Sequence, residues 1–284
     1  MGLSFGLGLP PAPNKGGSFY AGWPLAFDFV NNKYRVGVGR GYSSSFLEQP
    51  GVTYARTGAD LLSYNPVTGK WQAFAANAPA LLTGAGQDVP EGTTNKCTNY
   101  NAAPDAGLTS VSKSGDAAAT LTRVDDTAAL LAAGFGPLID AGKMNGFVFR
   151  LDNSAGSTDA FAVISGTFGN TNVHEMSVFA RGSGVFSANA HVGWGGGSIS
   201  NNALTSAFVR YFGTPSAPTN SAGAMRIRAS AGAVVYFILN QLEEKTYATN
   251  PVIVSGAAAT RGNAQPVVTG LSSILTPPFT LVAV

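Results

Sequence analysis

Short segments of the chain alternate hydrophobic and polar residues, a spacing typical of strands that lie on a hydrophobic core. Phe147, Phe149 and Leu151, for example, would all face one side of an extended segment. Runs of this kind predict eight strands, at residues 119–124, 146–151, 160–167, 174–180, 185–192, 206–212, 225–229 and 233–242. We therefore expect an all-β protein whose main domain, residues 91–255, is an antiparallel β-sandwich of the jelly-roll type.

Turn-forming residues separate these segments. The stretches 152–159 and 193–202 are rich in such residues and are predicted to be connecting loops. One short helix is predicted over residues 127–133, where the sequence reads TAALLAA. Asp125 and Asp126 come directly before it and can cap its first turn.

Residues 19–90 carry only short extended pieces, at 25–30, 34–38 and 52–56. Their clearest turn is NPVTGK at residues 65–70, where proline presets φ and glycine can adopt a positive φ. We expect an extended, strand-poor region in front of the sandwich that serves attachment or oligomerisation.

Residues 1–18 are rich in Gly and Pro, and large apolar side chains recur at every second position near the start: Leu3, Phe5, Leu7 and Leu9. If the segment is extended, these side chains form one apolar edge. The segment is either a disordered terminus or a flexible arm that anchors the chain on another subunit or assembly. We favour the arm, because four large apolar side chains would otherwise face water.

The last residues, LVAV at 281–284, are also apolar and follow two prolines. A strand that ends in this way leaves an edge open to pairing. We therefore expect residues 256–284 to be a linker and the start of a further β domain. On this hypothesis 281–284 either pair with another subunit or lead into that domain.

Composition narrows the class of protein. Of the 284 residues 45% are hydrophobic and 11% charged, which argues against disorder and against a charge-laced helical protein. The net charge is +2 without a basic cluster, so nucleic acid is not an expected partner. No apolar run approaches the roughly 18 residues of a membrane span. The single cysteine, Cys97, cannot close an intrachain disulfide and is expected to be a small buried residue.

Known catalytic motifs are absent from the sequence, which has no P-loop, no GxSxG nucleophile elbow and no HExxH zinc motif. His174 and Glu175 are neighbours on a predicted strand, so their side chains face opposite sides and cannot act together as base and orienting acid. The two carboxylates of an adjacent acidic pair, 125–126 or 243–244, cannot lie on both sides of a glycosidic bond. A pair of carboxylates that are distant in the sequence remains an alternative. We expect no enzymatic activity and no catalytic residue.

One loop has the residue types of a calcium site. Asp152, Ser154 and Asp159 place oxygen ligands around a glycine turn, which is one way to bind calcium. A solvated hairpin loop explains the same residues. No other cofactor is expected.

A second loop carries a candidate glycan contact. Trp194 lies among glycines, and an exposed ring there could stack on a sugar, with Tyr211 and Asn201 as accessory groups. The alternative is that the ring packs in the core or against another subunit.

Several stretches resemble bacteriophage and prophage virion proteins, of the tail-fibre or head-fibre kind, that carry a jelly roll similar to carbohydrate-binding modules. The most specific stretches run from FRLDNSAGSTDAFAVISG through HEMSVFARGSG at 149–184, and from GAVVYFILNQLEE to GAAATR at 232–261. The resemblance implies that Gln241, Leu242 and Glu243 end the last core strand. Related modules place a structural calcium between this strand and the first one. This chain has Asn240 where sugar-binding relatives often carry aspartate.

The resemblance implies a non-enzymatic structural protein of a phage particle, a fibre or a surface decoration, assembled in the bacterial cytoplasm and located at the virion surface. Its N-terminal region would bind other virion proteins, and its sandwich would project from the particle. One form of this hypothesis has the sandwich facing host-surface polysaccharide. A homotrimer is the default expectation, because cyclic symmetry hides apolar surface without an open interface. The alternatives are an adhesin that binds host polysaccharide and a depolymerase, which needs two carboxylates converging in a groove.

Overall fold

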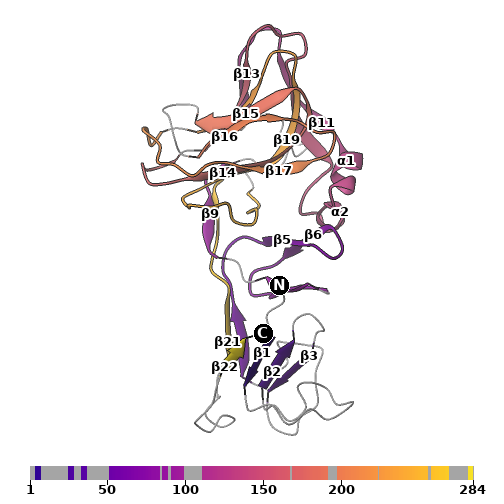
Figure 1. Ribbon diagram of the computed structural model, residues 1–284, viewed down its shortest axis with the longest axis vertical. Coiled ribbons are helices and arrows are strands. Elements are labelled where there is room, and N and C mark those ends of the chain that lie inside the picture. Colours follow the sequence, from indigo (N-terminus) through magenta and orange to yellow (C-terminus); the bar gives the residue numbers. More distant parts are fainter. Residues whose placement is uncertain are drawn as a thin grey trace.

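The structure, a computed structural model, describes residues 51–83, 85–88, 91–98, 111–166, 168–190, 197–222, 224–254 and 257–268. For residues 4–7, 25–28, 33–36, 86, 265–268 and 281–283 it describes the backbone alone. Short antiparallel strands dominate, which confirms the all-β class. No helix among these residues is long and apolar enough to cross a membrane. The molecule is long, with a β-sandwich at one end and a narrower part, here called the stalk, below it (Figure 1).

Two five-stranded antiparallel sheets form the sandwich. The sheet farther from the stalk, here called the distal sheet, has the order β10 (Val111–Gly115), β13 (Ala160–Ile164), β18 (Met225–Ala229), β15 (Val185–Ala190) and β16 (Ile199–Ala203). The nearer sheet, here called the proximal sheet, has the order β11 (Thr120–Asp125), β12 (Phe147–Asp152), β19 (Val234–Glu243), β14 (Glu175–Ser183) and β17 (Val209–Phe212).

The main core lies between the two sheets, because every second residue of their central strands is apolar and points inward. In β18, Met225, Ile227 and Ala229 are buried in this core. Arg226 and Arg228 alternate with them and therefore point outward. One side of the distal sheet thus packs on the core and its other side carries the arginines of β18.

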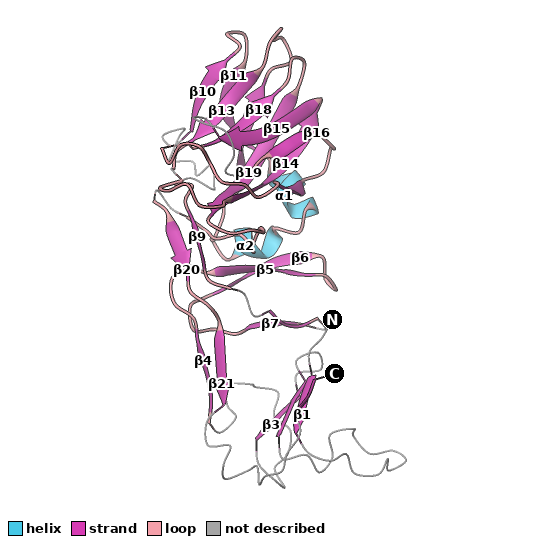
Figure 2. Cartoon of the chain, turned by 60° about the vertical axis from the view of Figure 1, so that its left-hand side comes forward, coloured by secondary structure: helices cyan, strands magenta, loops and turns pink. Residues whose placement is uncertain are grey.

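A second core covers the outer face of the proximal sheet. Helices α1 (Thr127–Ala132) and α2 (Gly136–Asp140) and the hairpin of β5 (Leu61–Asn65) and β6 (Lys70–Phe74) pack there (Figure 2). Phe135 stacks on Trp71 of β6 with ring centroids 5.9 Å apart, and it meets Phe179 of β14 edge-on at 5.1 Å. Hydrophobic packing therefore joins the hairpin to the sandwich.

The stalk pairs segments that are far apart in the sequence. β4 (Val52–Ala55) pairs with β21 (Gln265–Val268), and β9 (Thr93–Asn95) pairs with β20 (Ala259–Arg261). β7 (Ala80–Leu82) and β8 (Gly86–Asp88) form a further hairpin. At the end opposite the sandwich, β1 (Ser4–Leu7), β2 (Leu25–Asp28), β3 (Lys33–Val36) and β22 (Leu281–Ala283) form a sheet in the order β22-β1-β2-β3 (Figure 1).

The eight strands predicted for the sandwich are all present, with shifted ends. β10 was not predicted, and the loop predicted over 193–202 is wrong from Ile199 onward, where β16 begins. The predicted helix is confirmed as α1, whereas α2 was not predicted. Asp126 stands at the N-cap position of α1 without capping it, and Oδ1 of Asp125 instead accepts a hydrogen bond of 3.0 Å from the backbone N of Thr127.

The predicted turn at 65–70 joins β5 to β6. Oδ1 of Asn65 accepts a hydrogen bond of 2.9 Å from the backbone N of Val67, and Gly69 has a φ of +67°. A residue with a Cβ would be strained at that φ, so the asparagine and the glycine together fix the hairpin.

The two terminal segments pair with each other. Leu281–Ala283 pairs with β1 of the same chain and forms an edge of that sheet, so the expected pairing of this segment with another subunit stays a prediction. Phe5 and Leu7 lie on β1, which also pairs with β2, while Leu3 and Leu9 lie outside the described residues. The side chains of the proposed anchoring arm lie outside the description as well, so its docking on another subunit stays a prediction.

Candidate functional site

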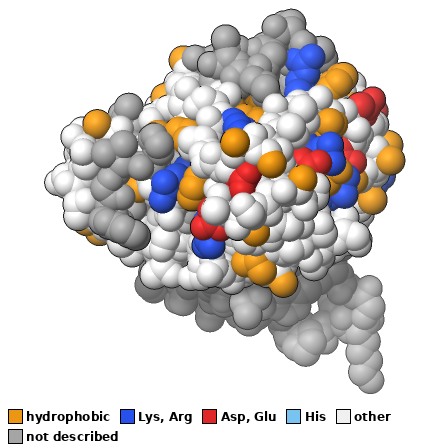
Figure 3. All heavy atoms as spheres, turned by 90° about the horizontal axis from the view of Figure 1, so that it is seen from above, with side chains coloured by type: hydrophobic (Ala, Val, Ile, Leu, Met, Phe, Trp, Pro, Cys, Tyr) orange, Lys and Arg blue, Asp and Glu red, His pale blue; other side chains and the backbone are white. Residues whose placement is uncertain are grey.

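The outer face of the distal sheet, here called the open face, lies opposite the second core. Its outward-pointing residues come from all five strands: Ser112, Ser114, Phe161, Val163, Ser187, Asn189, Asn201, Arg226 and Arg228. Apart from the buried Ser187, they are partly or fully exposed. Figure 3 views the molecule from this side and shows basic, acidic and hydrophobic side chains close together. A ligand in solution can therefore reach these side chains.

Arg226 stands on β18, the middle strand of the open face. Its partners in register are Val163 of β13 and Asn189 of β15. Its Nε donates a hydrogen bond of 2.6 Å to Oδ1 of Asn189, and its guanidinium carbon lies 4.4 Å from the centroid of the Phe161 ring. Burial, and then the charge of Arg228, lower the pKa of Arg226 from its ordinary value. The amide and the ring together hold the guanidinium plane in place.

Arg228, two residues along the same strand, contacts the side chains of Asp159 and Asn201. Its Nε lies 2.7 Å from Oδ2 of Asp159, and its Nη2 donates a hydrogen bond of 3.0 Å to Oδ1 of the same carboxylate. Its Nη1 donates to Oδ1 of Asn201 at 3.0 Å. Asp159 therefore pairs with Arg228 and not with Arg226, which leaves a positive charge on this part of the open face. Guanidinium, amide and hydroxyl groups of this kind can bind sugar hydroxyls and attract an anion.

The structure places two of the three residues predicted to contact a glycan, and it puts them on different sides of the distal sheet. Asn201 is exposed on the open face, where it accepts the hydrogen bond from Arg228. Tyr211 of β17 points between the sheets, and its ring meets that of Phe186 edge-on with centroids 4.6 Å apart. Trp194 lies outside the described residues. Of the three, only Asn201 is placed on the open face.

Sequence reasoning missed Arg226, Arg228 and Phe161. The signal for the arginines was the stretch MRIRA at 225–229, where two arginines alternate with apolar residues and must share the outer side of a strand. That alternation predicted the strand correctly, but its polar side was not considered as a site. The position of Phe161 beneath Arg226 depends on the pairing of β13 with β18, which the sequence did not reveal.

The residues predicted to bind calcium have other partners. Oδ2 of Asp152 forms an ion pair with Arg150, and its Oδ1 accepts a hydrogen bond of 3.0 Å from the backbone N of Ser154. Asp159 is paired with an arginine of the open face. Among the residues that the structure describes, no group of three or more His, Cys, Asp or Glu side chains could hold a metal ion. The loop is held instead by Asp116, whose Oδ2 accepts hydrogen bonds of 2.8 Å from two backbone N–H groups of the loop.

Two buried glutamates face each other on the proximal sheet. Glu175 of β14 and Glu243 of β19 are partners in register, and neither is exposed. Oε1 of Glu175 accepts a hydrogen bond of 2.7 Å from the backbone N of Gly213, whereas Nε2 of His174 lies 2.8 Å from Nζ of Lys96. His174 and Glu175 thus have separate partners. The two carboxyl groups lie opposite each other, as a glycosidase pair would, but they are buried and a sugar does not reach them where they lie.

Glu175 makes the stability of the fold dependent on pH. Burial, with a smaller effect from Glu243 opposite, raises the pKa of Glu175 to about 7. An acid whose pKa is raised by folding binds its proton more tightly in the folded state, so stability falls as pH rises from about 4.3, the ordinary glutamate value, through 7. Glu175→Gln keeps the acceptor for Gly213 and cannot ionise. We expect this variant to gain melting temperature relative to the natural chain between pH 5 and pH 8.

The matched control for this measurement is Glu244→Gln. Hydrogen bonds from Asn172 and Asn170 lower the pKa of Glu244 to about 2, so its charge does not change between pH 5 and pH 8. The difference in melting temperature between this variant and the natural chain should therefore stay constant over that range. If the difference in melting temperature between Glu175→Gln and the natural chain is also constant over that range, Glu175 has an ordinary pKa and the prediction is wrong.

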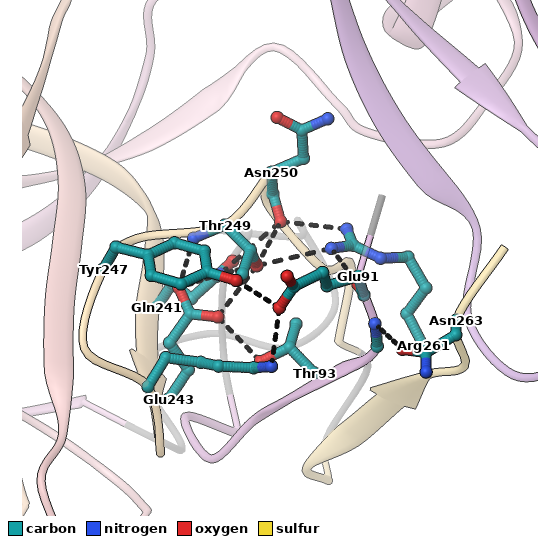
Figure 4. A network of polar contacts seen from close by, with 11 residues as sticks. Glu91, Thr93, Gln241, Glu243, Tyr247, Thr249, Asn250, Arg261 and Asn263 are labelled. Atoms are coloured by element: carbon teal, nitrogen blue, oxygen red, sulfur yellow. Dashed lines mark hydrogen bonds and ion pairs between the residues drawn. The ribbon is translucent and has the colours of Figure 1, made fainter. Parts of the chain in front are cut away.

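Glu243 also belongs to a buried polar network that joins β19 to the stalk (Figure 4). Its Oε1 accepts hydrogen bonds from the backbone N of Thr249 at 2.7 Å and from Nε2 of Gln241 at 2.8 Å. Its Oε2 accepts from the hydroxyls of Thr93 at 2.7 Å and Thr249 at 2.8 Å. Arg261 of β20 donates to the Thr249 hydroxyl at 3.3 Å, and burial lowers the pKa of Arg261 to about 10. One carboxylate thus connects β9, β19 and the segment before β20.

No protein-family model matches the sequence, and neither does any curated protein. Among solved structures, the chain is weakly similar to the enzymatically active domain of tailspike protein 4 of bacteriophage CBA120, with 13% identity and a TM-score of 0.35. That match covers 52% of this chain and 21% of that chain. The chain is also weakly similar to the family 11 carbohydrate-binding module of a cellulosomal cellulase of Clostridium thermocellum, with 9% identity, a TM-score of 0.26, and coverage of 62% of this chain and 95% of that chain. These likenesses identify no family.

Proposed function

We propose that this chain is a non-enzymatic structural protein of a phage particle that presents a carbohydrate-binding sandwich to the host surface. The observation that carries the proposal is the open face: it is polar, charged and aromatic, and it lies on the far side of the sandwich from the stalk. The outer face of the proximal sheet, by contrast, is covered by the second core. The phage assignment is supported by the resemblance of residues 149–184 and 232–261 to virion proteins.

The two ends of the molecule fit the two proposed roles, attachment to the particle and presentation of the sandwich to the host. The sheet of β1, β2, β3 and β22 lies at the end opposite the open face (Figure 1), and it contains the first strand of the proposed anchoring arm. Attachment to other virion proteins at that end, as a homotrimer, would direct the open face away from the particle. The buried network around Glu243 and the packing of Phe135 would keep the sandwich from swinging on the stalk.

Adsorption of the phage to its host tests this proposal. The purified full chain, added in excess, should bind polysaccharide extracted from the host surface and should slow adsorption of the particles. Heat-unfolded chain at the same concentration is the control. A chain that neither binds any host-surface polysaccharide nor changes the adsorption rate would refute the proposal.

We expect the chain not to cleave glycans. Glu175 and Glu243, the two glutamates partnered in register on the proximal sheet, are buried, and Glu243 already accepts four hydrogen bonds from protein groups. A general acid and a nucleophile must both reach the glycosidic oxygen and the sugar carbon. Incubation of host polysaccharide with the chain should release no new reducing ends. Release that is abolished by substitution of a single Asp or Glu would show that the protein is an enzyme.

A further inference from the structure

We infer that the open face recognises a carboxylate-bearing polysaccharide, and that Arg226 binds the carboxylate. This inference rests on the proposed function and names the class of glycan. It starts from the guanidinium of Arg226, in which Nε is bound to Asn189 and one face lies over Phe161. Nη1 and Nη2 have no partner among the described residues. The described residues therefore leave the two N–H groups that point the same way from the guanidinium to a ligand.

The charges around Arg226 favour an anion. The carboxylate that contacts the arginines of β18 is Asp159, and both of its oxygens are taken by Arg228. Among the described residues Arg226 is therefore a cation without a carboxylate partner, and burial, followed by the positive charge of Arg228 next to it, lowers its pKa. A bound carboxylate would balance this charge, whereas a neutral sugar would leave it as it is.

The geometry favours a carboxylate group over a single hydroxyl. A guanidinium fork and a carboxylate are both planar, and they match through two parallel hydrogen bonds. Asn189 and Phe161 fix the plane of the guanidinium before the ligand arrives, which lowers the entropy lost on binding. The hydroxyls of Ser112 and Ser114, on the neighbouring part of the face, can bind the hydroxyl groups of adjoining sugars.

The open face is wide enough to contact several sugars of a polymer. The distal sheet is five strands wide, and strands lie about 4.8 Å apart, so its outer surface extends well beyond one sugar. The residues on it come from strands on both sides of β18, so that a chain crossing the sheet would meet Arg226 at the middle. A carboxylated sugar in a repeating unit would place a new carboxylate at this point in each register.

Titration of the full chain with defined polymers tests the inference. The probes are polygalacturonate, alginate and polysialic acid as carboxylated glycans, poly(glycerol phosphate) as a phosphate polymer, and a neutral β-glucan. At least one carboxylated glycan should bind at least about 10-fold more tightly than the other two classes, since a hydrogen bond to a charged group is worth about one order of magnitude or more. The preference should shrink as salt is added.

Variants locate the binding on Arg226. Arg226→Gln should weaken binding of the preferred glycan by about 10-fold or more, and Arg226→Lys, which keeps the charge and loses the fork, by several-fold. Lys70→Gln, the same change of charge at an exposed position of the hairpin, should stay within about 2-fold. Arg226→Lys decides the question if Arg226→Gln does not fold.

Each other outcome overturns the inference in a distinguishable way. Equal binding of neutral and carboxylated glycans, or binding unchanged by both Arg226 variants, would overturn it and leave the proposed function standing. Preference for poly(glycerol phosphate) would assign the fork to phosphate and overturn the carboxylate. No binding of any polymer, host polysaccharide included, would overturn the inference and the proposed function together.

Discussion

Glu243→Ala should lower the free energy of unfolding by about 3–5 kcal/mol, because it removes one partner from a buried charged network. The side chain of Glu243 is 0% exposed and accepts four hydrogen bonds, from Gln241, Thr93 and twice from Thr249. Its loss takes a buried acceptor away from each of these donors and removes the negative group with the largest effect on the buried charge of Arg261. Chemical denaturation followed by tryptophan fluorescence measures the loss.

Glu244→Ala is the control, one position along the chain. The side chain of Glu244 is 39% exposed, pairs with Lys96 at 3.4 Å and accepts hydrogen bonds from Asn170 and Asn172. Because water can replace these exposed contacts, we expect Glu244→Ala to cost less than Glu243→Ala. A loss for Glu243→Ala no larger than that for Glu244→Ala would contradict a stabilising role of the network between sandwich and stalk.

Phe135→Ala should cost about 3–5 kcal/mol, the usual range for removing a large aromatic side chain from a core. Phe135 is 0% exposed and lies between Trp71 of the hairpin and Phe179 of the proximal sheet. The cavity would open where the hairpin meets the sandwich, so proteolysis should cut the hairpin earlier in the variant than in the natural chain.

Leu131→Ala, in the neighbouring helix, provides the comparison. Leu131 is 50% exposed, and its truncation should change the free energy of unfolding by less than about 1 kcal/mol. Similar losses for Phe135→Ala and Leu131→Ala, or unchanged proteolysis of the hairpin, would mean that the hairpin is not held by the second core.

Within the distal sheet, the strands that sequence reasoning found and missed differ in how much they bury. The central strand β18 buries three of its five residues, in strict alternation, and was predicted. The two strands of this sheet that were missed, β10 and β16, are its edges, and each buries one residue, Val111 and Ile199. An edge strand with one buried residue has no alternation to detect, and its polar residues read as a loop.

The contacts within the site could not be predicted either, because they depend on how the strands of the sheet pair. The two arginines on one side of β18 could be predicted from alternation alone. That Arg226 lies over Phe161 and Arg228 against Asp159 depends on the register between β13 and β18. Register follows from the packing of the whole sheet, which no short motif encodes. Tyr211 was misjudged for a related reason, since the side of β17 that faces the core depends on which sheet the strand joins.

The most direct test of the account is a reconstruction of the phage particle by electron cryo-microscopy with this chain located in the density. The account predicts that the end with β1, β2, β3 and β22 contacts other virion proteins and that the open face, with Arg226 at its centre, points away from the particle. A particle in which the open face is buried against another virion protein, or one that lacks the chain altogether, would contradict it.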